Sequence, residues 1–101
     1  MTKKPSAPPS HLSAEAKKLW ANLREEYMLD DPAGQLLLRS ALEAFDRCSE
    51  ARRLLAKDGS VVRDRWNQAK VHPAVAVEAS ARQQMHSALR LMKLAPDELE
   101  G

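Results

Sequence analysis

Residues 30–59, DDPAGQLLLRSALEAFDRCSEARRLLAKDG, determine the fold of this 101-residue chain. Asp30 and Asp31 place negative charge at a helix N-terminus, and Pro32 suits the first helical position because its missing N–H needs no partner there. Gly59 supplies the left-handed residue that commonly ends a helix. We therefore predict one helix over residues 32–57, about 39 Å long at about 1.5 Å per residue. Apolar side chains recur along it at helical spacing, at Leu38, Ala41, Leu42, Phe45, Cys48, Ala51 and Leu55.

A helix of this length has consequences in so small a chain. A compact domain of about 100 residues has a radius of gyration of about 13 Å, so the helix would exceed the diameter of roughly 26 Å that this implies. It must therefore project from the domain or pack against another subunit. A short chain also buries only about 60–65% of its unfolded surface, and association with further copies would supplement its thin core.

One shorter helix is predicted before this stretch. Ser13 is a good N-cap, and Glu15 in the first turn interacts favourably with the helix dipole. The pattern indicates a helix over residues 14–27, with its aromatic residues expected to anchor the core. The apolar stripe of this helix consists of Ala16, Leu19, Trp20, Leu23 and Tyr27.

After Gly59 the sequence changes character and then returns to a helical pattern. The β-branched pair Val61–Val62, alternating charges and a turn at 66–69 favour a short two-stranded hairpin or an extended loop. Pro73 opens a third helix over residues 73–94. Its apolar seam is spaced close to a heptad repeat and consists of Ala74, Val77, Ala81, Met85, Ala88 and Met92.

Together these elements predict a mainly all-α fold. The long helix and the last helix form an antiparallel helical hairpin, with the first helix across them and the short β-hairpin or extended loop between the last two helices. We expect three parts along the chain. Residues 1–12 form a disordered basic, Pro-rich arm, residues 13–95 form the helical domain with its oligomerisation surfaces, and residues 96–101 form a short acidic tail.

Several function classes lack support in the sequence. The three glycines form no Gly-Lys-Ser/Thr phosphate loop, and the three histidines and Cys48 show no metal-ligand spacing. The acidic pairs Glu25–Glu26 and Asp30–Asp31 are adjacent in sequence. Adjacent helix residues point apart and the second pair caps a helix, so no general acid–base role is expected for either pair. We therefore expect no catalytic activity, no metal and no cofactor. No apolar run is long enough for a membrane span and no secretory signal is expected, so a cytosolic protein is the simplest interpretation.

Basic residues are concentrated in the middle of the chain. Residues 47–70 carry seven basic and three acidic side chains, a local net charge of +4, whereas the whole chain has a net charge of +2. Basic side chains interleaved with Trp66 suit docking to nucleic acid or to a protein. The alternative is a solvated helix face, with Trp66 folded back on the helices and Asp64 neutralising part of the charge.

The order of these features resembles the small terminase subunits of tailed double-stranded DNA bacteriophages, in their short helical family. The resemblance covers about residues 8–96. It departs from the family at Asn67-Gln68-Ala69, where a glycine and a basic residue are expected near the turn. The residues that carry it are Pro9-Ser10-His11-Leu12-Ser13-Ala14-Glu15-Ala16, Leu19-Trp20, Leu29-Asp30-Asp31-Pro32-Ala33, Ala44 to Arg47, Asp58-Gly59, Val62, Asp64-Arg65, Lys70-Val71-His72-Pro73-Ala74, Glu78 and Ala81-Arg82.

The resemblance implies a non-enzymatic specificity factor that acts in the host cytoplasm. Such a subunit recognises the packaging start site on viral DNA, assembles into a ring, and recruits or regulates the large terminase subunit, which carries the ATPase and nuclease. The alternative is a helical adaptor that binds no DNA and whose basic zone docks an acidic partner protein.

Two sets of residues are the candidates for these contacts. Repeating a modest basic surface around a ring would multiply weak phosphate contacts. The DNA-binding candidates are Arg52, Arg53, Lys57, Arg63, Arg65 and Lys70, with Lys3, Lys4, Lys17 and Lys18 as a second group. The candidates for the interface between copies are Trp66, Val77, Ala81, Met85, Ala88 and Met92.

Overall fold

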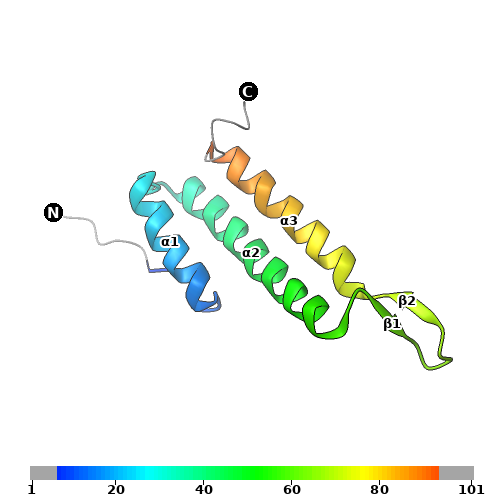
Figure 1. Cartoon of the computed structure of the whole chain (residues 1–101). Coiled ribbons are helices and arrows are strands. Elements are labelled where there is room, and N and C mark those ends of the chain that lie inside the picture. The colour runs from blue at the N-terminus through cyan, green and yellow to red at the C-terminus, as the bar shows by residue number, and fades with distance from the viewer. Residues whose placement is uncertain (1–6, 94–101) are drawn as a thin grey trace.

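The computed structural model describes residues 7–93, which form three helices and one β-hairpin. Helix α2 lies between α1 and α3, α2 and α3 run antiparallel, and the hairpin extends beyond their connected ends (Figure 1). The predicted fold class is therefore confirmed. The elements are α1 (Ala14–Glu26), α2 (Pro32–Asp58), β1 (Val61–Arg63), β2 (Ala69–Val71) and α3 (Pro73–Leu91).

Each helix begins at a side chain that accepts a hydrogen bond from its first turn. The Ser13 hydroxyl accepts from the Ala16 N–H at the start of α1, and the Asp31 carboxylate accepts from the Gly34 N–H at the start of α2. At α3 the acceptor is Nδ1 of His72, 2.9 Å from the Ala74 nitrogen. These bonds satisfy N–H groups that have no partner within the helix.

The turn that ends α2 is fixed by Gly59 and His72. Gly59 has a φ of 80°, a conformation that side chains disfavour, and its N–H donates to the Leu55 carbonyl at 2.8 Å. Nε2 of His72 lies 3.0 Å from the Asp58 carboxylate. The same imidazole therefore caps α3 and ties it to the last residue of α2, which holds the base of the hairpin.

A first packing zone joins α1 to the N-terminal half of α2. Its buried residues are Leu12, Ala16, Trp20, Leu38 and Leu42. Leu12 is only 4% exposed, and Nε2 of His11 lies 2.6 Å from the Glu43 carboxylate. The packed part of the chain thus includes residues 11 and 12, ahead of the expected start at residue 13. Instead of crossing both long helices, α1 packs on α2, and Met92 beyond the end of α3 reaches the same cluster.

A second zone, made of small side chains, joins α2 to α3. Ala74, Ala81 and Ala88 are buried at seven-residue intervals on α3. They face a similar series on α2 that includes Ala44, Cys48 and Ala51. Side chains this small let two helices approach closely.

The helices form a single layer. The molecule measures 64 × 36 × 18 Å, and α1, α2 and α3 lie side by side (Figure 1). One layer cannot enclose a core on both sides. Large apolar side chains accordingly remain exposed among the described residues, including Met28, Leu36, Trp66 and Leu91.

Candidate nucleic-acid and subunit interfaces

The hairpin is a short ribbon with an ordered loop at its tip. The strands pair antiparallel, with Val61 opposite Val71 and Arg63 opposite Ala69. One carboxylate oxygen of Asp64 accepts the backbone N–H groups of Trp66 at 2.9 Å and Gln68 at 3.0 Å. These bonds hold the loop in one conformation.

The charge of Asp64 is stabilised by the groups around it. The backbone N–H of Gln68, then that of Trp66, and the Lys70 ammonium lower the pKa of this carboxyl below its ordinary value of 3.8. The second oxygen of Asp64 lies 3.5 Å from the Lys70 nitrogen. Asp64 is therefore ionised at neutral pH and cancels part of the charge of Lys70.

The backbone conformation of Asn67 lets the loop turn tightly, although the loop lacks the glycine expected from the family resemblance. Its φ is 61°, in the left-handed region that glycine adopts most easily and asparagine tolerates better than most residues. Its N–H donates to the Asp64 carbonyl at 2.9 Å. The departure at residues 67–69 therefore preserves a tight turn.

Three of the basic candidates are engaged in ion pairs. Arg52 contacts Glu78 at 3.0 Å across the α2–α3 contact, Lys70 contacts Asp64, and Arg53 pairs with Glu50 one turn earlier on α2. All three side chains stay largely exposed. Their charges are partly balanced, which lowers what each would add to phosphate binding.

Lys57, Arg63 and Arg65 form no ion pair with another residue of the described range 7–93. Arg63 donates to the Asn67 carbonyl at 2.8 Å, and the Arg65 guanidinium lies 4.8 Å from the centre of the Trp66 ring. Trp66 itself is 67% exposed, so it does not fold back on the helices. The structure thus brings uncompensated positive charge and an exposed aromatic ring together at the hairpin end.

The second group of basic candidates lies elsewhere. Lys17 and Lys18 belong to α1, which packs on the N-terminal half of α2 and not beside the hairpin (Figure 1). Lys3 and Lys4 lie outside the described residues. The structure therefore does not join these two groups into one basic surface.

Glu78 on α3 connects the two long helices through side-chain contacts that its position in the sequence does not predict. One of its oxygens lies 3.4 Å from the Cys48 sulfur and 3.0 Å from Arg52, and the other lies 3.7 Å from Arg82. The thiol hydrogen bond and the two arginines lower the pKa of Glu78, while burial and the Glu78 contact raise the pKa of Cys48. Cys48 therefore stays a protonated thiol that supports the packing.

The seam expected on α3 is mostly used inside the protomer. Ala81 and Ala88 are buried against α2, Met85 is half-buried, and Met92 packs against the α1–α2 cluster. Val77 and Trp66 remain exposed, at 46% and 67%. Of the six interface candidates, these two are the ones whose side chains are most available to another molecule.

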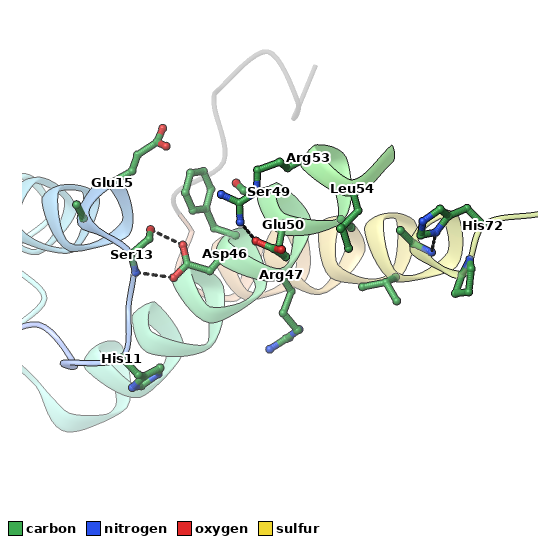
Figure 2. Close-up of a pocket in the computed structure, with 16 residues that line it drawn as sticks. His11, Ser13, Glu15, Asp46, Arg47, Ser49, Glu50, Arg53, Leu54 and His72 are labelled. Carbon is green, nitrogen blue, oxygen red and sulfur yellow. Dashed lines mark hydrogen bonds and ion pairs between the residues drawn. The ribbon is translucent and has the colours of Figure 1, made fainter. Parts of the chain in front are cut away.

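An open groove of about 870 Å³ lies where α1 stops covering α2. Its apolar wall includes Phe45, Leu54 and Val77, and residues at the start of α1 and of α3 close its two ends (Figure 2). Leu54 is 37% exposed and stands beside the buried stripe of α2, which is why the stripe alone did not reveal it. The acids that line the groove are Glu15, Asp46 and Glu50.

Two of the three acids in this groove have hydrogen-bond or ion-pair partners within the protomer. Asp46 accepts hydrogen bonds from the Ser13 N–H at 2.8 Å and the Ser13 hydroxyl at 2.5 Å, and Glu50 pairs with Arg53 (Figure 2). No group of three or more potential metal ligands occurs among residues 7–93. The groove is thus an apolar surface with a polar rim, a composition typical of a protein contact.

A family model described as "Phage terminase, small subunit" matches residues 13–99. The chain belongs to this family. The match extends over all three helices and the hairpin, and the small subunit is the non-catalytic component of a terminase. No curated protein and no solved structure matches the chain significantly.

Membership in the small terminase family assigns a general role in packaging phage DNA and confirms the resemblance seen in the sequence. The partners of this family are, in general terms, DNA and the large terminase subunit. No helix within residues 7–93 is long and apolar enough to cross a membrane.

Proposed function

We propose that this small terminase subunit is the DNA-packaging specificity factor of its phage, acting in the host cytoplasm. It assembles into a ring, binds viral DNA at the packaging start site, and recruits or regulates the large terminase ATPase and nuclease. The observation that carries the proposal is the family match over residues 13–99, joined to a projecting hairpin whose end is basic.

The hairpin end supports direct DNA contact. Lys57, Arg63 and Arg65 have no carboxylate partner among the described residues, and no helix packs over the tip. Exposed cations of this kind neutralise phosphates and release counterions, which gives binding that weakens steeply with salt. Lys70 on β2 and the two arginines on α2, Arg52 and Arg53, would add weaker contacts because each is ion-paired.

The single layer of helices supports assembly. The groove with Leu54 and Val77 offers an apolar face that a second copy would cover, and a contact between two different surfaces of the same chain generates a ring when its rotation closes. A ring repeats each weak DNA contact at high effective concentration. A modest charge per subunit is then sufficient for tight binding.

A charge reversal at the tip tests the DNA contact. We expect Arg65→Glu to weaken binding to a 30-base-pair duplex by about tenfold, and to lower the salt slope by about one for each phosphate that Arg65 neutralises in wild type. Arg90→Glu is the matched control, because Arg90 is an exposed arginine in the last turn of α3, at the other end of the layer. Arg65→Lys should stay close to wild type, since it keeps the charge.

Equal binding by Arg65→Glu and wild type would remove the hairpin from the DNA surface. The adaptor alternative makes a different prediction, because a protein that binds only an acidic partner should show no salt-dependent affinity for any duplex. Fluorescence anisotropy at several salt concentrations separates these cases, provided that the mass of each variant's assembly matches that of wild type.

A further inference from the structure

Trp66 places a large aromatic side chain at the hairpin tip, and general phosphate binding does not require such a side chain. It is 67% exposed at the tip of the projecting ribbon, whereas the other tryptophan, Trp20, is 4% exposed in the core. An exposed aromatic ring among cations is a surface on which nucleic-acid bases stack. We propose that Trp66 is a wedge that inserts between base pairs of duplex DNA and kinks it, so that the subunit recognises how easily its site deforms.

The loop holds this ring ready for insertion. Asp64 accepts two backbone N–H groups of the loop, one of them from Trp66 itself, and Asn67 fixes the turn with its left-handed backbone. A side chain presented on an ordered loop loses little conformational freedom on binding. The tip therefore behaves as a preformed probe.

The surroundings of the ring favour DNA over a second copy of the chain. The Arg65 cation lies over the ring, and Arg63 donates to the Asn67 carbonyl in the same loop. Burying this tip in a protein groove would require acids to meet the two arginines. The apolar groove already contains two arginines, Arg47 and Arg53, which would repel the arginines of the tip, and its Glu50 is already paired with Arg53. Phosphates on both sides of a DNA groove would meet both arginines.

The free-energy cost of unstacking DNA depends on the base step, so a wedge can distinguish between sites. A two-stranded ribbon fits in a DNA groove, and a side chain that separates a base step pays an unstacking cost that is smallest at flexible pyrimidine–purine steps. Discrimination between sites then arises from deformability as well as from base edges. The inference rests on the proposed function, because it requires that the chain bind DNA.

The test compares two duplexes of equal length at one salt concentration, one with a central TA step and one with a stiff central A-tract. We expect wild type to prefer the TA duplex at least about fivefold, and to raise the fluorescence of a 2-aminopurine placed beside that step. Trp66→Ala should lose about tenfold in affinity for the TA duplex, lose the preference, and leave the probe unchanged. Trp66→Phe should keep much of both effects.

Gln68→Ala is the matched control, because Gln68 takes part in the loop through its backbone and its side chain is exposed. This variant should behave as wild type in both assays. The assembly of each variant is also weighed by native mass spectrometry. The inference is overturned if Trp66→Ala keeps the preference and the probe signal, or if it changes the assembled mass, since Trp66 would then lie between copies.

Failure of the wedge is distinguishable from failure of the proposed function. If wild type binds both duplexes equally and Trp66→Ala does the same, DNA binding stands and the wedge falls. If wild type binds neither duplex, the DNA-binding role itself falls, and the wedge falls with it.

Discussion

At the scale of single residues, Asp64 determines the shape of the hairpin tip. Its carboxylate holds two loop N–H groups and faces Lys70, and these contacts lower its pKa. A group whose pKa is lowered on folding stabilises the folded loop above its ordinary pKa, and this contribution is lost as the pH falls through the lowered value. The loop should thus be insensitive to pH across the neutral and mildly acidic range.

This pH dependence is testable by NMR. We expect the amide resonances of Trp66 and Gln68 to stay constant from about pH 7 down to about pH 5 and to move together only below the ordinary aspartate pKa of 3.8. Asp64→Asn removes the titrating group, so its loop resonances should not show that transition. Loop amides in wild type that already shift near pH 5 would contradict this role for Asp64.

Some side-chain contacts can be inferred from spacing in the sequence, and others cannot. The pair Glu50–Arg53 lies one helical turn apart and can be inferred from spacing. The pair Arg52–Glu78 cannot, because it joins residues 26 positions apart on two helices. The charge count therefore overstated the free positive charge on α2, and only the structure shows that, of the first group of DNA-binding candidates, Lys57, Arg63 and Arg65 are the ones without an ion pair within residues 7–93.

At the scale of elements, capping residues and prolines were sufficient to predict where the helices begin and where α2 ends. The caps at Ser13, Asp31 and Gly59 act as the sequence suggested, and Pro32 and Pro73 open α2 and α3. The apolar seam of α3 was harder to interpret. A periodic pattern identifies the side of a helix that is covered but not the surface that covers it. Ala81 and Ala88 face α2 of the same chain, which the pattern left open.

Paired substitutions on α3 test the close packing of α2 and α3. We expect Ala81→Leu to destabilise the protein by about 1–3 kcal/mol, because Ala81 is 2% exposed and the contact has no room for a larger side chain. Ala79→Leu makes the same change two residues earlier at an exposed position and should stay within about 0.5 kcal/mol of wild type.

Thermal and urea unfolding monitored by circular dichroism measure both variants. Equal stability of Ala79→Leu and Ala81→Leu would mean that α3 does not pack tightly on α2 in solution. The comparison uses the same residue pair on the same helix, so differences in helix propensity cancel.

At the scale of the whole molecule, the protein is a thin layer that leaves an apolar groove open. Val77 and Leu54 would be buried by a neighbouring copy in an assembly, whereas they stay exposed to solvent in a monomer. The predicted long helix already indicated packing against another subunit or projection from the domain, because its length exceeded the diameter of a compact domain of this size. The groove itself could not be inferred, because it depends on where α1 stops along α2.

Substitution in the groove tests the proposed subunit contact. We expect Val77→Asp to shift the assembly strongly towards smaller species, because a buried charge without a partner is costly in an interface. Ala76→Asp, one position earlier on the same helix and exposed, should leave the assembly unchanged. Sedimentation velocity reports both, and circular dichroism confirms that each variant is folded. Identical sedimentation of the two variants and wild type would place the subunit contact elsewhere.

The mass of the purified protein by native mass spectrometry tests whether this small terminase subunit works as a DNA-binding ring. At micromolar concentration we expect one discrete species of many subunits that gains the mass of a duplex when DNA is added. A monomer or dimer that stays the same size both alone and with duplex would contradict a DNA-binding ring.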